Sequence, residues 1–247
     1  GRLFYIKNFI KLSAIRSNKV LTLSESSKKD IVKYTNIDEK KITVTPIGKT
    51  PLCALKHELK ENDWQDVKLK YKLDKKYILF IGQLLYRKNV DIVIKAMAGL
   101  TEDDFDFIII GGKKESFEYL NALVKDFNLT DRVRFLGELS DKETALILSK
   151  AEIFIYPSLY EGFGIPVLEA MCYGIPTITS NVSSLPEVGG DACYYINPED
   201  IYLAQDALKE LLLDKTLREK LVLAGFKQAK KFEWEDIAQR TLRVLKC

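Results

Sequence analysis

The sequence has few of the residues that build disulfide or metal sites. Its 247 residues include four cysteines and one histidine, and no two cysteines form a Cys-x-x-Cys pair. Such a set predicts neither a disulfide framework nor a structural zinc site. The thiols fit a reduced, cytoplasmic setting. We expect Cys172 and Cys193 in the core and His57, which lies in a polar stretch, at the surface.

Long apolar runs and an excess of one charge are also missing. No segment reaches the roughly 20 uninterrupted apolar residues of a membrane-spanning helix. The first residues lack the apolar run and cleavage site of a signal peptide. The formal net charge is only +3, from 38 basic and 35 acidic residues. This balance gives no reason to expect a nucleic acid partner, but it permits a peripheral contact with an anionic membrane surface.

Two common nucleotide-binding motifs are absent as well. A Walker P-loop occurs nowhere in the chain. The dinucleotide fingerprint Gly-x-Gly-x-x-Gly fails after the strand expected at residues 77–81, because Leu84 and Arg87 occupy positions that need glycine. These absences argue against a P-loop ATPase and against a nicotinamide dehydrogenase.

Short apolar runs alternate with longer amphipathic segments along most of the chain. Strands are expected at residues 20–23, 42–45, 77–81, 107–110, 133–136, 153–156 and 177–179. Helices are expected at 25–34 (with Ser24 as N-cap), 64–71, 90–98, 116–127, 142–149, 166–173, 199–213, 215–231 and 234–246. Near-continuous apolar strands, each followed by a helix, indicate a parallel sheet with both faces covered. We therefore predict a doubly wound, Rossmann-like α/β domain whose ligands bind at the carboxyl ends of the strands.

A basic loop follows the expected strand at 77–81. Gly82 lets the backbone turn, and Arg87 and Lys88 place two cations just before a helix, for which Asn89 is the expected N-cap. Cations beside a helix N-terminus suit a diphosphate. On these residues alone, a solvated charge pair in a turn is an equally good interpretation.

A second loop, after the expected strand at 153–156, carries two glutamates. Gly162 and Gly164 allow backbone N–H groups to approach a ligand, and Glu169 lies one turn inside the next helix. Carboxylates such as Glu161 and Glu169 accept hydrogen bonds from sugar or ribose hydroxyls. In the alternative interpretation, Glu161 only stabilises the helix N-terminus and Glu169 is a surface residue.

The spacing of Glu161 and Glu169 resembles the signature of the retaining glycosyltransferases of family four. Residues 24–31, 42–48, 82–89 and 183–192 are similar to further segments of that family, and the resemblance covers about residues 20–247. It implies the GT-B arrangement of two facing Rossmann-like domains, of which the first binds mainly the acceptor and the second mainly the donor nucleotide sugar.

The resemblance also divides the chain. Residues 1–48 would be the end of the N-terminal acceptor domain, 49–76 a linker, 77–230 the nucleotide-sugar-binding domain, and 231–247 a C-terminal helix that packs back towards the N-terminal domain. Most of the acceptor domain is then missing. Trp234 is expected to anchor the last helix by packing.

The same resemblance implies roles for residues in the loops. Lys88 would neutralise the diphosphate leaving group with Arg87 beside it, and Glu161 would contact the transferred sugar. Glu169 would hold the donor ribose. The other expected donor contacts are Gly82, Gln83, Gly137, Leu139, Gly162, Phe163, Gly164 and Ile165. Gln83 stands where family members often carry arginine, so that Arg87 would compensate.

No metal or other cofactor is expected. Asp104-Phe105-Asp106 matches the Asp-x-Asp pattern of metal-dependent glycosyltransferases. The motif lies at the start of an expected strand, which is the wrong end for a ligand, and within an acidic run. We therefore interpret it as a solvated turn.

The sequence thus predicts the donor-binding half of a retaining glycosyltransferase. Such an enzyme would move a sugar from a nucleotide sugar to a glycan or lipid-linked acceptor, in the cytoplasm or on the inner face of a membrane. The Arg87-Lys88-Asn89 loop is similar to that of mannosyltransferases that use GDP-mannose. A non-catalytic nucleotide-sugar-binding module and a subunit of a split enzyme remain open. Other GT-B enzymes, such as an epimerase or a phosphorylase, fit the motifs less well.

Overall fold

The computed structural model describes residues 2–100 and 105–246, and its strands form two parallel sheets. The large sheet has the strand order β5-β4-β3-β6-β7-β8, and β1 pairs only with β2. The strands are β1 (Val20–Thr22), β2 (Ile42–Val44), β3 (Lys76–Ile81), β4 (Phe105–Ile110), β5 (Val133–Gly137), β6 (Ile153–Tyr156), β7 (Thr177–Ser180) and β8 (Cys193–Ile196). All pairs within the large sheet are parallel.

This strand order confirms the predicted doubly wound fold. The chain enters the sheet at β3, moves outward to β5, returns beside β3 as β6 and then moves to the other edge. Ligands of such sheets bind where the order reverses, at the carboxyl ends of the two middle strands. The four-residue edge strand β8, whose two tyrosines are half-buried, was not predicted.

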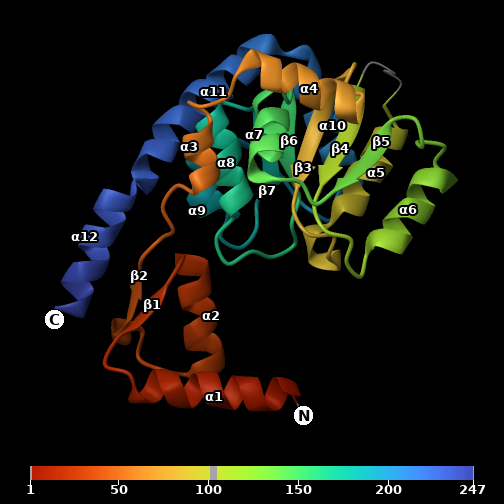
Figure 1. Cartoon of the computed structure of the whole chain (residues 1–247). Coiled ribbons are helices and arrows are strands. Elements are labelled where there is room, and N and C mark those ends of the chain that lie inside the picture. Colours follow the sequence, from red (N-terminus) through yellow and green to blue (C-terminus); the bar gives the residue numbers. More distant parts are fainter. Residues whose placement is uncertain (1, 101–104, 247) are drawn as a thin grey trace.

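Helices cover both faces of the large sheet (Figure 1). On one face lie α5 (Val90–Ala98), α6 (Phe117–Asp126) and α10 (Ile201–Leu213). The other face carries α3 (Pro51–Leu55), α4 (Glu61–Tyr71), α7 (Asp141–Ser149), α8 (Ile165–Tyr173) and α11 (Lys215–Ala229). Short turns of helix are η1 (Glu39–Lys41), η2 (Tyr86–Lys88), α9 (Leu185–Gly189), η3 (Gly190–Ala192) and η4 (Lys230–Phe232). No helix was predicted at α3 or α9, each of which has five residues.

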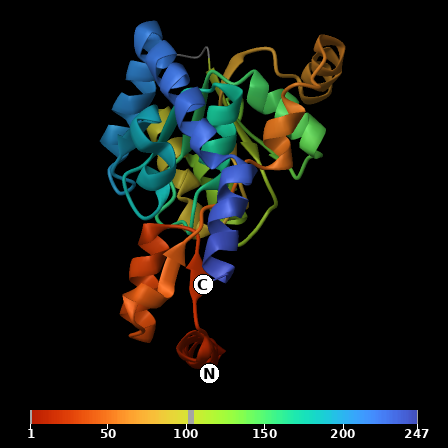
Figure 2. The ribbon, with the colours of Figure 1, turned by 90° about the vertical axis from the view of Figure 1, so that its left-hand side faces the viewer.

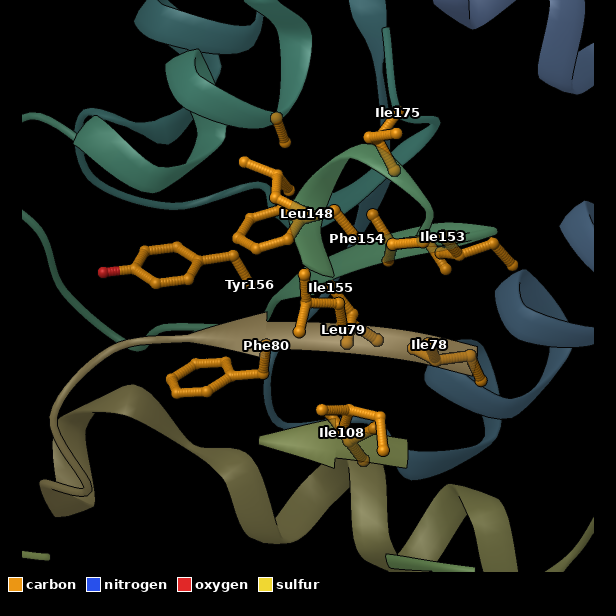
Figure 3. Close-up of a cluster of buried hydrophobic side chains, with 14 of the residues drawn as sticks. Ile78, Leu79, Phe80, Ile108, Leu148, Ile153, Phe154, Ile155, Tyr156 and Ile175 are labelled. Atoms are coloured by element: carbon orange, nitrogen blue, oxygen red, sulfur yellow. The ribbon is translucent and has the colours of Figure 1, made fainter. Parts of the chain in front are cut away.

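The core lies between the central strands and the helices on them. Side chains of β3 and β6, such as Ile78, Phe80 and Phe154, are fully buried (Figure 3). Each large apolar side chain buried in this way stabilises the fold by about 1.5–3 kcal/mol. The Tyr156 ring stacks on Phe80 and Phe154, with centroid distances of 5.7 and 6.1 Å. The core thus holds the Tyr156 phenol at the carboxyl end of β6.

A small unit precedes the large domain and comprises α1 (Arg2–Arg16), β1, α2 (Glu25–Thr35) and β2. The Ser24 side chain caps α2 as predicted, by accepting a hydrogen bond from the Ser27 N–H. The last helix, α12 (Trp234–Leu245), leaves the large domain and extends alongside this unit (Figures 1 and 2).

Trp234 holds α12 where the chain passes between the two parts. Its indole N–H donates to the Lys49 carbonyl oxygen at 2.7 Å. Its ring lies so close to Gly48 that a Cβ there would be 2.5 Å from it. Trp234 therefore anchors the helix as expected, although 55% of it is exposed. None of the helices in the described part of the chain is long and apolar enough to span a bilayer.

Both Cys172 and Cys193 were expected in the core, and the structure confirms this for Cys193 but only in part for Cys172. Cys193 is buried, and Cys172 is half-buried. Cys172 lines a cavity of about 710 Å³ together with Cys53. His57 is exposed as expected.

Candidate active site

A cavity of about 460 Å³ lies at the carboxyl ends of β3, β4 and β5. Four of the predicted donor residues line it: Gly82, Gln83, Leu139 and Glu169. Glu138, which the family resemblance places beside Leu139 at the nucleobase, also lines it, and the polar residues of the wall that sequence reasoning did not assign to the site are Thr50, Asp141 and Thr144. The cavity stands beside the point where the strand order reverses, as the fold requires.

A glycine stands at the carboxyl end of each of these strands: Gly82 follows β3, Gly111 follows β4, and Gly137 is the last residue of β5. The Gly82 N–H donates to the Ile110 carbonyl oxygen at 2.8 Å, and the Gly111 N–H donates to that of Gly137 at the same distance. At Gly111, where φ is +148°, a Cβ would lie 1.9 Å from the Gly82 oxygen, so only glycine fits. Gly137 has φ of +76° and does not line the cavity.

Sequence reasoning missed Gly111 and its neighbour Gly112. Both directly follow β4, and both line the cavity. The rule that pointed to Gly82, namely that ligands lie at the carboxyl ends of strands, would have found them too.

Glu169 lies on α8, one turn from its start, as predicted. It is only 8% exposed, so the interpretation as a surface residue was wrong. Its Oε1 accepts a hydrogen bond from the Thr50 hydroxyl at 2.5 Å. Burial raises the pKa of Glu169 to about 7, and the hydrogen bond from Thr50 opposes that rise only in part.

A second group of polar side chains surrounds one oxygen of Glu161. Glu161 Oε1 lies 2.6 Å from Lys88 Nζ and 2.9 Å from an Arg87 guanidinium nitrogen. The Tyr156 hydroxyl donates to the same oxygen at 3.0 Å and accepts a hydrogen bond from Lys88. Lys88 and Glu161 are buried, so the interpretation of a solvated charge pair was wrong for Lys88; the Arg87 side chain is 45% exposed.

The charge state of this cluster follows from its contacts. Burial alone would raise the pKa of Glu161, but Lys88, Ser158 and Arg87 together hold it below its ordinary value. Glu161 is therefore ionised at neutral pH. Burial lowers the pKa of Lys88, and the nearby carboxylate opposes that change. Burial also raises the pKa of the Tyr156 phenol, which stays protonated as a donor.

Asn89 occupies the predicted N-cap position of α5 but does not cap the helix with its side chain. Its backbone is left-handed, with φ of +57°, which asparagine tolerates better than most residues. Its side-chain amide instead donates to the carbonyl oxygens of Pro157, at 3.1 Å, and Pro198, at 2.6 Å. Asn89 thereby ties the basic loop to the loops after β6 and β8.

The glutamate loop leads from Glu161 into α8. Among the described residues, none accepts a hydrogen bond from the backbone N–H groups of positions 162–165. Gly164 is the N-cap of α8, with φ of +113°. The Phe163 ring is buried against Phe232, and Ile165 is half-buried, so their backbones rather than their side chains are the groups available to a ligand. A helix N-terminus with free N–H groups suits an anion or hydroxyls.

Of the Asp-x-Asp motif, Asp106 does not lie in a solvated turn. Asp106 is buried in β4, and burial raises its pKa, while Arg134 lies 3.9 Å from its carboxylate. It stands near the amino end of the strand, away from the cavity. Asp104 lies outside the described residues. Within residues 2–100 and 105–246, no three His, Cys, Asp or Glu side chains gather in a metal-binding group.

Comparison with known proteins shows the family of the chain. Residues 62–228 match the family described as glycosyl transferases group 1. The chain belongs to this family. Among curated members, this group 1 chain is 31% identical over 250 residues to O-antigen chain mannosyltransferase B of Escherichia coli, with 99% of the chain and 65% of that protein covered. It is 33% identical over 207 residues to O-antigen chain mannosyltransferase RfbU of Salmonella typhimurium, with 84% and 54% covered.

Solved structures place the group 1 chain among GT-B folds. HepE of Anabaena, in complex with UDP-glucose, has a TM-score of 0.86 at 16% identity over all of the chain and 69% of HepE. A glycosyltransferase of Rickettsia africae has a TM-score of 0.84 at 19% identity, over 93% of the chain and 63% of that protein. These likenesses show the fold alone. The chain spans 54% and 65% of the length of the two curated relatives above.

Proposed function

We propose that this group 1 chain is the donor-binding half of a retaining glycosyltransferase. The observation that carries the proposal is the pairing of a buried cation with a buried carboxylate, Lys88 with Glu161, beside a cavity at the reversal of strand order. A nucleoside diphosphate sugar would lie across this crevice, with the nucleoside in the cavity and the sugar near Glu161.

The nucleoside end depends on Glu169. Its buried carboxylate would accept hydrogen bonds from the two ribose hydroxyls. Among the described residues, Thr50 is the one donor to this carboxylate. Gly137, the last residue of β5, and Glu138 and Leu139, which follow it, would border the base.

The diphosphate end depends on Lys88 and Arg87. Cleavage of the glycosyl–phosphate bond places negative charge on the departing phosphate, and fixed cations stabilise that charge. Both cations contact Glu161, and a bound diphosphate would compete for their N–H donors. Because Lys88 is buried, its charge acts where water screens it little.

Glu161 would orient the transferred sugar and stabilise positive charge at its anomeric carbon. Its Oε1 already accepts hydrogen bonds from Lys88, Arg87 and Tyr156, which weakens it as a nucleophile. We therefore assign it an electrostatic role in a transfer that retains configuration, without a metal ion.

The names of the relatives favour mannose as the sugar. Two are O-antigen chain mannosyltransferases, and the Arg87-Lys88-Asn89 loop is similar to that of GDP-mannose enzymes. We therefore propose GDP-mannose as the donor and a glycan or lipid-linked saccharide as the acceptor. Such an acceptor would place the complete enzyme in the cytoplasm, with a peripheral contact to the inner face of the membrane and an N-terminal domain that completes the acceptor site.

Calorimetric titration with GDP, UDP, ADP and GDP-mannose tests the donor site. We expect one diphosphate to bind, and Glu169→Ala and Lys88→Ala each to weaken it by about 1.5–3 kcal/mol, as for loss of a charged hydrogen-bond partner. Lys113→Ala is the matched control, since Lys113 follows β4 but does not line the cavity. Failure of the folded chain to bind any of these nucleotides would refute the proposal.

A further inference from the structure

Serine hydroxyls hold three consecutive carbonyl groups of the glutamate loop. The buried Ser184 hydroxyl lies 2.9 Å from the Glu161 carbonyl oxygen and 2.8 Å from that of Phe163, so that its proton is shared between them. The carbonyl between these two, that of Gly162, points elsewhere. It accepts hydrogen bonds from two serines of the small unit.

Those two serines are Ser24 and Ser27, at the start of α2. Their hydroxyl oxygens lie 2.9 and 3.2 Å from the Gly162 carbonyl oxygen. They are separated from Gly162 by more than 130 positions in the sequence and belong to the part of the chain that precedes the Rossmann-like domain. In Figure 1 the small unit lies below the large domain, with α2 directly beneath the loops that follow the strands.

A second contact fixes α2 in this place. The Glu187 carboxylate accepts hydrogen bonds from the backbone N–H groups of Glu25 and Ser26, both at 2.7 Å. A carboxylate at this end of a helix also interacts favourably with the helix dipole. The Tyr160 hydroxyl donates to Asp30 at 2.6 Å, one helical turn further along α2. The start of α2 is therefore docked onto Gly162, with further contacts to Tyr160 and to Glu187 of α9.

The serines thereby orient the N–H groups of the loop. In a trans peptide the N–H points opposite to the preceding carbonyl. When Ser24 and Ser27 hold the Gly162 oxygen, the Phe163 N–H must point away from α2. Ser184 likewise turns the N–H groups of Gly162 and Gly164 away from itself. As noted above, these N–H groups have no acceptor among the described residues.

We propose that Ser24, Ser27 and Ser184 are positioning residues for the sugar-phosphate part of the donor. They act through the loop backbone, whose oriented N–H groups donate to phosphate oxygens or sugar hydroxyls. Since Ser24 and Ser27 come from the acceptor side, docking of α2 completes the donor site and couples the two halves of the enzyme. This inference rests on the proposed nucleotide-sugar function.

Two ligands distinguish a positioning role from a merely structural one, because they differ in whether they carry the sugar-phosphate part. A nucleoside monophosphate such as GMP would use the cavity around Glu169 and not the glutamate loop. GDP-mannose would use both. A positioning role predicts a loss of affinity for GDP-mannose alone, whereas a general weakening of the fold would affect both ligands.

Calorimetric titration of Ser27→Ala with GMP and GDP-mannose provides the test, with Ser26→Ala as the matched control. Ser26 lies on the same turn, and its hydroxyl makes no hydrogen bond within the described part of the chain. We expect Ser27→Ala to weaken GDP-mannose binding about three- to tenfold, the usual effect of one hydrogen bond, and to leave GMP binding unchanged. Ser26→Ala should bind both ligands as the wild type does.

A second variant checks that the effect of Ser27→Ala does not come from a distortion of α2. Ser24→Gly removes a hydroxyl donor but weakens the helix only slightly, because glycine is a tolerated N-cap. It should show the same selective loss as Ser27→Ala. Equal losses for both ligands, or no loss in either variant, would overturn the positioning role alone. A wild-type chain that binds neither ligand would overturn the proposed function, and this inference with it.

Discussion

Replacement of Glu169 by glutamine should stabilise the chain above pH 7 while weakening nucleotide binding. Burial sets the pKa of the folded-state carboxyl at about 7, against an ordinary value of 4.5. Between these two pH values the folded chain holds a proton that the unfolded chain has lost. Stability therefore falls as the pH rises from about 4.5 to about 7, and the full penalty applies above pH 7.

The size of the penalty follows from that interval. Each pH unit between the two pKa values lowers the folding stability by about 1.4 kcal/mol. The ionised Glu169 therefore costs the fold about 3 kcal/mol above pH 7. Glutamine has a similar shape, cannot ionise and still accepts the Thr50 hydrogen bond through its amide oxygen. Glu169→Gln should recover most of the penalty, which raises Tm by about 6–12 °C at pH 8 for a chain of this length.

Thermal unfolding followed by circular dichroism between pH 4.5 and 8 provides the measurement. The curves of Tm against pH for the wild type and Glu169→Gln should meet near pH 4.5 and separate as the pH rises. Glu143→Gln is a control of opposite sign, because hydrogen bonds from Lys70 and Ser140 lower the pKa of Glu143 to about 2. That variant loses stability at neutral pH and only approaches the wild type as the pH falls towards 2. A Glu169→Gln variant that is no more stable than the wild type at pH 8 would refute this account of Glu169.

Three further predictions concern the same region. Lys88→Met leaves Glu161 buried without its main partner and should lower the free energy of unfolding at pH 7 by about 3–5 kcal/mol in urea denaturation; a double variant that also carries Glu161→Gln should recover most of it. Gly111→Ala should abolish nucleotide binding and sharply lower Tm, because the added Cβ would collide with the backbone. Gly137→Ala has open space around it and should lose only about 1–2 kcal/mol of folding stability, the cost of a left-handed backbone at alanine. Nucleotide affinity should rise as the pH is raised through 7, because ribose hydroxyls donate best to an ionised Glu169, and titration at pH 6 and 8 checks this.

The sequence was sufficient to predict the parts of the fold whose signal is local. The buried strands β3 and β6 are apolar runs, and the loops that follow them carry glycines and charges that stand out within a few residues. The position of Glu169 one turn inside α8 follows from Pro166 and the glycines before it. Such features need no knowledge of distant contacts.

Contacts between distant segments could not be predicted in this way. Thr50 lies 119 positions before Glu169, and nothing near Thr50 in the sequence shows that it bonds to a carboxylate. The burial of Lys88 depends on Tyr156, which looks like one more apolar residue of a strand until its hydroxyl is placed. Asn89 was correctly predicted at the N-cap position of α5, but the left-handed backbone that turns its amide towards Pro157 instead of the helix has no sequence signal of its own.

The polar groups of the crevice lower the stability of the fold, which indicates that they are present for function. Glu169 is held by burial near a pKa of 7, and the ion pair of Lys88 and Glu161 is buried where apolar residues of similar size are often as stable or more so. Both features lie at the carboxyl edge of the sheet, while fully buried apolar side chains such as Ile78 fill its centre and supply the stability that these charges remove. A sequence that only had to fold would gain by replacing them, so their presence at the reversal point is itself an argument that a ligand rich in hydroxyl and phosphate groups is bound there.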